Sequence, residues 1–213
     1  MFYDITKRVI DILSVVILGT VFSPFLIVLP ILVKLESEGP VLFSHKRVGK
    51  NGKEFKLYKF RSMYKNADEW LIKNKKLQSK FKNELGGWKM TVDEDPRITK
   101  IGKFMRKLTL DEFPQLINVL KGEMSLVGPR PYRKDEVGDE IQEQLKKHPH
   151  LKEEIKVLLS VKPGITGPWQ TSGRNEIPWD KQVELGADYA RRRSILYDFW
   201  IIFKTPLAML SKW

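Results

Sequence analysis

The longest uncharged stretch of the chain runs from Ile12 to Val33 and is almost entirely apolar. Its length matches the roughly 20 apolar residues with which a helix crosses the hydrocarbon core of a bilayer. Ser23 and Pro24 interrupt the stretch near its centre. Proline has no amide hydrogen for the carbonyl four residues earlier and its ring crowds that turn, while serine can bond a freed backbone group. The pattern therefore predicts a hydrophobic helix that bends at Ser23-Pro24, and Pro30 weakens its second half further.

The charges that flank this stretch leave two membrane arrangements open. Lys7 and Arg8 precede it and Lys34 follows it with several further cations, so both flanks are basic. A re-entrant helix returns both flanks to the cytoplasmic face, as the positive-inside tendency favours, whereas a Pro-kinked transmembrane anchor leaves one flank outside. A signal peptide fits poorly because no small-residue cleavage pattern ends the run. We expect a re-entrant membrane helix over residues 1–35, followed by one continuous interfacial domain over residues 36–213.

Strand-like residues lie on both sides of Asn51-Gly52, the strongest short signal for a β-hairpin. The hairpin would bring five basic side chains close together: Lys46, Arg47, Lys56, Lys59 and Arg61. A solvated basic face is the usual explanation for such a run. The Lys-rich segment from Lys65 to Gly87 is expected to be a helical excursion at the surface or against a membrane, without chemistry.

Residues 99–108 have the pattern of an amphipathic, cationic helix. Apolar residues recur at helical spacing and cations fill much of the opposite face. Such a helix could lie at a membrane surface or cover a soluble core. A further helix is expected to begin between Thr109 and Asp111 and to end before Gly122, with Pro114 in its first turn.

Two acidic residues, Asp111 and Glu112, stand at the start of this further helix. In one interpretation Thr109 and Glu112 form a T-x-x-E capping box, and the positive end of the helix dipole favours both acids. In the other, the pair does chemistry, because a helix start also attracts phosphate and Arg106 and Arg130 could flank it. A carboxylate nucleophile and a carboxylate metal ligand would then face a neutralised phosphate.

The composition limits the kinds of partner that the chain is expected to bind. Its 213 residues allow one domain with a sizeable core, and its net charge of +12 indicates an anionic partner such as nucleic acid, an anionic membrane or a phosphorylated substrate. Cysteine is absent and the three histidines lack zinc-motif spacing, so a bound metal would be oxygen-ligated. The last segment combines cations with aromatics, which favours a membrane interface and is also compatible with core packing.

The run from Asp95 to Pro131, "DPRITKIGKFMRKLTLDEFPQLINVLKGEMSLVGPRP", resembles the bacterial sugar transferases, the monotopic polyprenyl-phosphate phosphoglycosyl transferases. The resemblance covers nearly the whole chain. It includes Lys7-Arg8 and Asp11, the Ser23-Pro24 break, the segment "YKFRSM", and "VKPGITGPWQTSGRN" near the C-terminus. It implies an α+β fold: a membrane-associated, mostly helical domain with an N-terminal re-entrant helical hairpin, a small β-hairpin and interfacial amphipathic helices.

The activity implied by the resemblance is transfer of a sugar 1-phosphate from a UDP-sugar to undecaprenyl phosphate, with release of UMP. The reaction would start a surface glycan such as an exopolysaccharide, O-antigen or capsule. The implied cofactor is Mg²⁺, the implied partners are both substrates and the lipid bilayer, and a homodimer is allowed, while no nucleic acid is expected. The implied location is the bacterial inner membrane, with the catalytic domain on its cytoplasmic face.

The resemblance also implies roles for individual residues. Asp111 matches the family's nucleophile and Glu112 its magnesium ligand. Three arginines are expected to bind substrate phosphate: Arg61, Arg106 and Arg130. Ser23 and Pro24 match the re-entrant break.

A later segment could contact the nucleotide or the sugar. The candidates are Lys162, Pro163, Gly164, Gly173 and Arg174. The family commonly has Arg-Pro-Gly where this chain has Lys162-Pro163-Gly164, and lysine keeps the charge but loses the planar fork of arginine. Pro163 and Gly164 could instead only shape a turn.

The alternative function is a basic, membrane-anchored module that binds an anionic polymer or nucleic acid, in which Asp111 and Glu112 only cap a helix. Basic charge and aromatics suit it too, yet no nucleic-acid-binding signature is present. The segment "GPWQTSGRN" and the excursion from Lys65 to Gly87 resemble those family members that transfer galactose or glucose phosphate, so the resemblance favours these two sugars.

Overall fold

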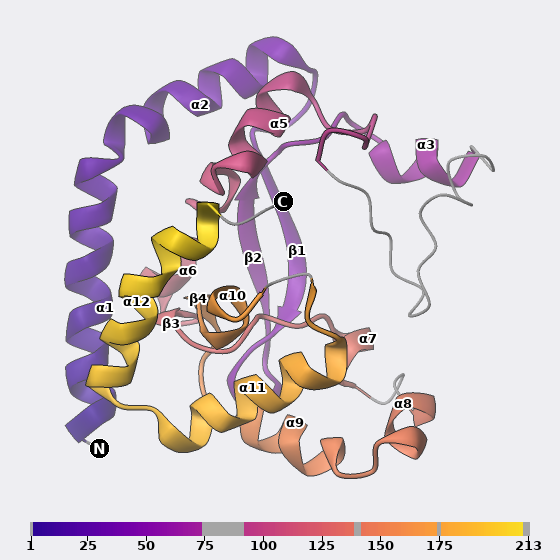
Figure 1. Cartoon of the computed structure of the whole chain (residues 1–213). Coiled ribbons are helices and arrows are strands. Elements are labelled where there is room, and N and C mark those ends of the chain that lie inside the picture. Colours follow the sequence, from indigo (N-terminus) through magenta and orange to yellow (C-terminus); the bar gives the residue numbers. More distant parts are fainter. Residues whose placement is uncertain (1, 74–91, 139–141, 174–175, 211–213) are drawn as a thin grey trace. The chain divides into compact units, whose positions relative to one another are not determined.

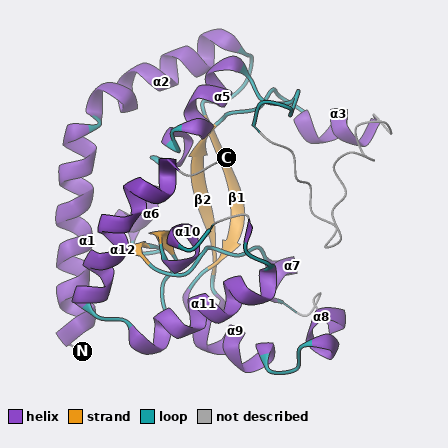
Figure 2. Cartoon of the chain, viewed as in Figure 1, coloured by secondary structure: helices purple, strands orange, loops and turns teal. Residues whose placement is uncertain are grey.

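The computed structural model describes residues 2–73, 92–138, 142–173 and 176–210. Figure 1 shows the helices and strands of the chain, which divides into two compact units. The first comprises Met1–Phe22, Ser44–Tyr58 and Pro114–Lys212, and the second comprises Ser23–Phe43 and Lys59–Phe113. Helices predominate and the strands form two small sheets, β1-β2 and β3-β4 (Figure 2), which confirms the α+β class. The expected division at residues 35 and 36 stays a prediction.

The hydrophobic N-terminal stretch forms two helices, α1 (Phe2–Val21) and α2 (Ser23–Glu36). The break at Phe22 confirms the predicted interruption, and Pro24 lies in the first turn of α2, where an amide has no helical partner. Helix α2 continues through Pro30, so this proline weakens it less than expected. In the described part of the chain no single helix is long and apolar enough to cross a membrane, although α1 and α2 meet that test together as a bent pair. A re-entrant course through a bilayer stays a prediction.

The predicted hairpin is present. Strands β1 (Leu42–Val48) and β2 (Glu54–Phe60) pair, and the 3₁₀ turn η1 (Lys50–Gly52) joins them. Asn51 and Gly52 have φ angles of 57° and 76°, in the left-handed region that Asn-Gly favours.

The core of the first unit has two main clusters. In one, α1 and α6 (Gln115–Lys121) pack with β2 through Val15, Phe55, Leu57, Leu116, Val119 and Met124. In the other, α9 (Leu151–Leu159) and α11 (Trp179–Arg192) pack through Leu151, Ile155, Leu158, Val183 and Ala187. The other helices of this unit, within its described residues, are α7 (Lys134–Val137), α8 (Gln142–Lys147), α10 (Pro168–Thr171) and α12 (Ile195–Leu210).

A second sheet was not expected from the sequence. Strand β3 (Ser125–Val127) runs parallel to β4 (Gly164–Thr166), with Ser125 opposite Gly164. The two backbones approach so closely that a Cβ atom on Gly164 would lie 2.1 Å from the nitrogen of Gly128. Position 164 therefore requires glycine, because any side chain there would clash with the backbone of Gly128.

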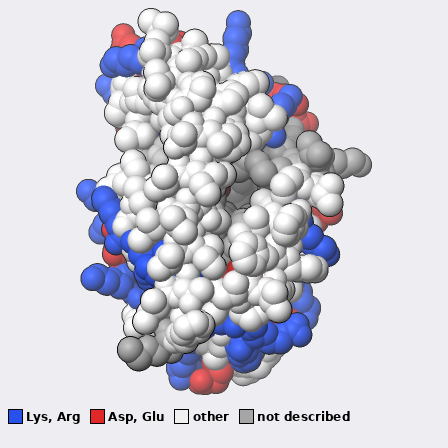
Figure 3. Space-filling model, turned by 90° about the vertical axis from the view of Figure 1, so that its left-hand side faces the viewer, with Lys and Arg blue, Asp and Glu red and all other residues white. Residues whose placement is uncertain are grey.

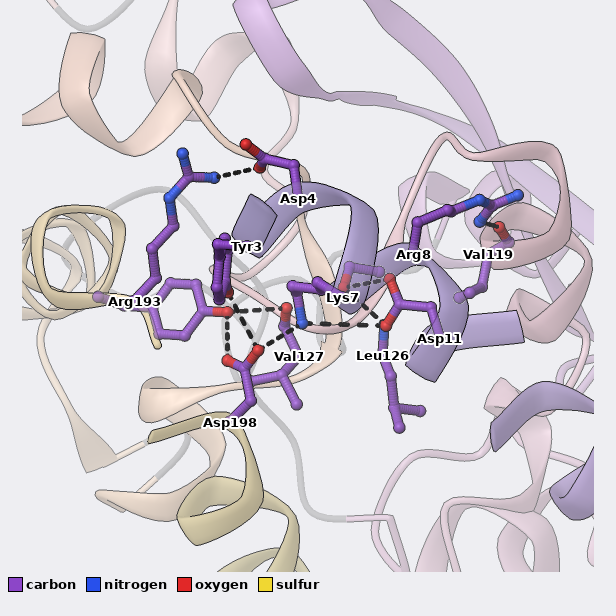
Figure 4. A network of polar contacts seen from close by, with 12 residues as sticks. Tyr3, Asp4, Lys7, Arg8, Asp11, Val119, Leu126, Val127, Arg193 and Asp198 are labelled. Carbon is purple, nitrogen blue, oxygen red and sulfur yellow. Dashed lines mark hydrogen bonds and ion pairs between the residues drawn. The ribbon is translucent and has the colours of Figure 1, made fainter. Parts of the chain in front are cut away.

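A buried polar network fixes α1 within the first unit (Figure 4). Asp11 accepts hydrogen bonds from the hydroxyl of Ser125 at 2.8 Å and the amide of Leu126 at 2.9 Å. Lys7 pairs with Asp198 at 2.8 Å, and Tyr189 donates to Asp198 at 2.6 Å. These contacts give Lys7 and Asp11 a role in joining α1 to β3 and α12.

The outer sides of α1 and α12 remain apolar. Large exposed side chains include Phe2, Val9, Leu13, Ile17, Leu196, Phe199, Phe203 and Leu207. Figure 3 looks onto this side of the first unit, where most atoms belong to uncharged residues. Such a surface suits the expected membrane contact.

The second unit is built around α2, α3 (Ala67–Lys73), α5 (Lys100–Lys107) and the 3₁₀ turn η2 (Leu110–Glu112). Its core contains Leu29, Val33, Phe60, Met105 and Leu110. Helix α5 confirms the predicted helix over residues 99–108. The single further helix expected from Thr109 is wrong, because the chain forms η2 and only later α6. Helix α6 ends at Lys121, just before Gly122, as expected.

Candidate active site

The acidic pair lies on η2, directly after a strained residue. Thr109 has a φ angle of 58°, which is uncommon for a β-branched residue. Its side chain makes no capping hydrogen bond, and its buried hydroxyl has no partner among the residues that the structure describes. The capping-box interpretation is therefore wrong. Asp111 and Glu112 need another explanation.

Lys59, near the end of β2, forms ion pairs with both carboxylates. Its ammonium group forms a short ion pair with Glu112 and lies 4.0 Å from Oδ2 of Asp111. The pattern of residues does not separate Lys59 from the other basic residues of the hairpin. Lys59 does lie in "YKFRSM", a segment that the resemblance to the sugar transferases includes, and this place could have marked it as a site residue.

Asp111 is buried, with 6% of its surface exposed. Burial raises the pKa of its carboxyl, and the neighbouring charge of Glu112 raises it further, while Lys59 and Arg106 lower it. The two cations thus favour the ionised carboxylate that a nucleophile requires. Asp111 combines a desolvated carboxylate with flanking positive charge.

Arg106 lies in the last turn of α5 and belongs to the same unit as the acidic pair. Its Nε atom donates to the hydroxyl of Ser62 at 2.9 Å. Burial lowers the pKa of Arg106, and the charges of Asp111 and Asp95 oppose that shift. Next to it Asp95 and Arg97 form a buried, two-pronged ion pair, with Nη2 of Arg97 2.8 Å from Oδ2 of Asp95. The charges of Arg106 and Asp111 thus act on each other, while phosphate binding by Arg106 stays a prediction.

Arg61 has contacts that the phosphate-binding interpretation did not anticipate. Its guanidinium donates to three backbone carbonyls at the end of α2, those of Val33 at 3.0 Å, Ser37 at 2.6 Å and Glu38 at 2.7 Å. Basic side chains commonly satisfy the last carbonyls of a helix in this way. These contacts argue for a structural role and leave phosphate binding by Arg61 untested.

Arg130 is held firmly in the first unit. Its Nη1 atom pairs with Glu136 at 2.9 Å, and its guanidinium lies 5.2 Å and 5.3 Å from the ring centres of Tyr132 and Trp169. Cation–π contacts of this kind restrict a long side chain. Arg130 belongs to a different compact unit from Asp111, so its role beside the acidic pair stays a prediction.

The late candidate residues have structural contacts. The carbonyl of Pro163 accepts from the amide of Ser125 at 2.9 Å, and Gly164 donates to Pro129 at 2.9 Å, both within the β3-β4 region. Burial, aided by the charge of Arg8, lowers the pKa of Lys162.

The other late candidates lie in or beside a turn. Gly173 has a φ angle of 132°, which indicates a turn position. Arg174 lies outside the described residues.

A family model described as "Bacterial sugar transferase" matches residues 2–212. The chain belongs to this family. The exopolysaccharide production protein ExoY of Sinorhizobium fredii is 37% identical over 98% of the chain and 87% of its own length. This match confirms the resemblance over nearly the whole sequence.

Two further relatives carry more specific names. The undecaprenyl-phosphate galactose phosphotransferase of Salmonella typhimurium is 39% identical over 97% of the chain, and the undecaprenyl-phosphate glucose phosphotransferase of Komagataeibacter xylinus is 38% identical over 93%. The chain spans 40% and 35% of these two relatives. Galactose and glucose relatives are about equally similar, so similarity does not select a sugar.

The site suits a magnesium ion only in part. Among the described residues, no group of three or more His, Cys, Asp or Glu side chains could hold a metal. Mg²⁺ at nucleotide sites is usually held by one or two carboxylates together with substrate phosphates. Glu112, with Asp111 beside it, fits a Mg²⁺ ion shared with a diphosphate and does not fit a site made of protein alone.

Proposed function

We propose that this protein transfers a sugar 1-phosphate from a UDP-sugar to undecaprenyl phosphate through a covalent intermediate on Asp111. The observation that carries the proposal is the buried carboxylate of Asp111 beside Lys59 and Arg106, in a chain of this family. Relatives named for undecaprenyl phosphate support the acceptor. The failure of the capping box removes the main reason for treating the acidic pair as structural.

In the first half-reaction, an oxygen of the Asp111 carboxylate attacks the phosphorus atom that carries the sugar. A bond forms between that oxygen and phosphorus, the phosphoanhydride bond breaks, and UMP leaves as an anion. A carboxylate needs no base for this attack. In the second half-reaction, an oxygen of the lipid phosphate attacks the same phosphorus, which regenerates the carboxylate and forms a lipid diphosphate sugar.

Charge is the main obstacle, because an anion must approach a dianionic diphosphate. Lys59 and Arg106 lie close enough to Asp111 to reduce this repulsion. When bound, Mg²⁺ would neutralise the diphosphate, and Glu112 is the residue that would hold it. Each such stabilising group is typically worth about 3 kcal/mol, on the order of a hundredfold in rate or more.

The proposed location is the inner membrane, with the catalytic residues at the cytoplasmic face. The apolar outer sides of α1 and α12, together with the uncharged run through α2, support membrane contact. A UDP-sugar is cytoplasmic and polyprenyl phosphate is held in the bilayer, so an enzyme that joins them has to work at that interface.

The test is UMP release by the protein in nanodiscs, with each of a panel of UDP-sugars. A covalent intermediate predicts that donor alone releases about one UMP per enzyme molecule, and that turnover follows when undecaprenyl phosphate is added. Mass spectrometry of the donor-treated enzyme should place the sugar phosphate on Asp111. UMP release that begins only after the lipid acceptor is added would contradict the two-step route.

A further inference from the structure

Glu36, the last residue of α2, reaches the start of α5. Its carboxylate accepts hydrogen bonds from the backbone amide of Lys100 at 2.6 Å and from that of Ile101 at 3.0 Å. The first amides of a helix have no partner within the helix, and the positive end of the helix dipole favours a carboxylate there. Thr99 caps only the amide of Gly102, at 2.9 Å. Of these three capped amides, those of Lys100 and Ile101 therefore depend on Glu36, a side chain of α2.

The same end of α2 has a second connection, through Arg61. The guanidinium that binds the carbonyls of Val33, Ser37 and Glu38 sits at the end of the strand that also carries Lys59. Gly39 has a φ angle of 119°, and a Cβ atom there would lie 2.3 Å from Nη1 of Arg61. Glycine at position 39 therefore leaves room for the guanidinium of Arg61 beside the end of α2.

Apolar packing provides a third connection. Leu29 and Val33 of α2 share one buried cluster with Met105 of α5 and Leu110 of η2. Only residues 108 and 109 separate α5 from η2, and the amide of Thr109 bonds back to the carbonyl of Arg106 at 3.1 Å. We therefore expect a shift in the start of α5 to move η2, the turn that carries Asp111.

We propose that Glu36 is a positioning residue that ties the hydrophobic helix α2 to the catalytic turn. Through α5 it sets the place of Arg106 and of Asp111, and it makes the position of α2 part of the active-site geometry. The consequence for the reaction rests on the proposed function. Among the described residues, the hydrogen bonds of the Glu36 carboxylate are made with amides of α5, and Glu36 takes no part in bond making.

The first experiment measures hydrogen–deuterium exchange in nanodiscs for the wild type, Glu36→Ala and Glu36→Gln, with Glu38→Ala as the matched control. Glu38 lies two residues further on and its side chain is exposed. Glu36→Ala should speed exchange at the amides of Lys100 and Ile101 and also in the peptide over residues 108–113. Glu36→Gln, which keeps an oxygen acceptor, should restore much of the protection, and Glu38→Ala should match the wild type.

The second experiment measures steady-state UMP release with donor and undecaprenyl phosphate, at a temperature at which each variant is fully folded by its melting curve. Misplaced catalytic groups typically cost between about tenfold and a hundredfold in rate, so Glu36→Ala should lower kcat by that range while the KM for donor changes little. Glu36→Gln should recover most of the rate.

Several results would overturn the proposal. Faster exchange confined to residues 100–102, with unchanged UMP release, would make Glu36 an ordinary helix cap. Unchanged exchange there would mean that the contact does not form in solution, and a rate that recovers when a destabilised variant is cooled would indicate a loss of folding alone. If the wild type releases no UMP with any donor, the proposed function fails, while the exchange measurement still tests the link between α2 and the catalytic turn.

Discussion

The ammonium nitrogen of Lys59 lies 4.0 Å from Oδ2 of Asp111, at the edge of a site in which burial raises the pKa of that carboxyl. Lys59 therefore does more than contribute to a solvated basic face: its charge acts on Asp111. It opposes the effect of burial and favours the ionised carboxylate.

The first prediction follows from this pair. Lys59→Met removes a charge that lowers the pKa of Asp111, so the pKa should rise and the acid limb of the rate profile should move to higher pH. UMP release measured from pH 5 to 9 would show this shift, together with a lower plateau. Lys56→Met, an exposed lysine of the same strand, should leave the profile unchanged. An unshifted limb in Lys59→Met would show that Lys59 does not control the ionisation of Asp111.

Asp111→Asn should abolish UMP release, because an amide cannot form the acyl phosphate. The same change should stabilise the fold. A carboxyl whose pKa is raised by folding contributes stability below its unfolded value, near 3.9, and loses that contribution as pH rises through the folded value. At neutral pH the variant should therefore melt at a higher temperature than the wild type, and the difference should shrink toward pH 4. Asp93→Asn serves as the control, because Asp93 is an exposed residue of the same unit and Lys107 lowers its pKa, so this variant should not melt at a higher temperature. Substantial turnover by Asp111→Asn would rule out this nucleophile.

Glu112→Gln should weaken the dependence on magnesium without removing the attacking group. Loss of one charge-stabilising group typically slows a reaction by roughly a hundredfold. A magnesium titration of UMP release should therefore show a higher half-saturating concentration and a lower maximum. A lower maximum with an unchanged half-saturating concentration would assign Glu112 to holding Lys59 and not to the metal.

Local patterns in the sequence were enough for the break before Ser23, the Asn51-Gly52 hairpin and the helix over residues 99–108. Each depends on residues close together in the chain. The T-x-x-E pattern failed although it is also local, because Thr109 adopts a left-handed conformation within the packed chain. Local preference is a weak guide where tertiary contacts decide the backbone.

The contacts that form the candidate site could not be predicted in the same way. Strands β3 and β4 have three residues each and pair across a long separation, so neither shows a period of two. Lys59 and Glu36 reach their partners on elements distant in sequence. The resemblance to a family located Asp111 and Glu112, while their surroundings came only from the structure.

The last prediction concerns the course of the N-terminal helices in the membrane. If the pair α1 and α2 re-enters, residues on its two flanks lie on the same cytoplasmic side. Single cysteines at Phe2 and Lys53 in this cysteine-free chain should then both resist a membrane-impermeant thiol reagent in intact cells and both react after permeabilisation. Opposite labelling would indicate a helix that spans the bilayer.

Replacement of Ser23 and Pro24 by Ala and Leu tests what makes the helix turn back. Leucine at 24 can donate to the carbonyl of Thr20, so α1 and α2 should merge into one straight helix long enough to cross the membrane. The cysteine at Phe2 should then become accessible from outside. Transfer of the sugar phosphate to the lipid should fall, because Asp111 no longer meets the lipid phosphate at the right depth. Ser23→Ala alone keeps the proline and should keep the wild-type labelling. If the double variant retains both its labelling and its activity, the break at Ser23-Pro24 does not determine the re-entrant course, and another feature of α1 or α2 has to hold the N-terminus on the cytoplasmic side.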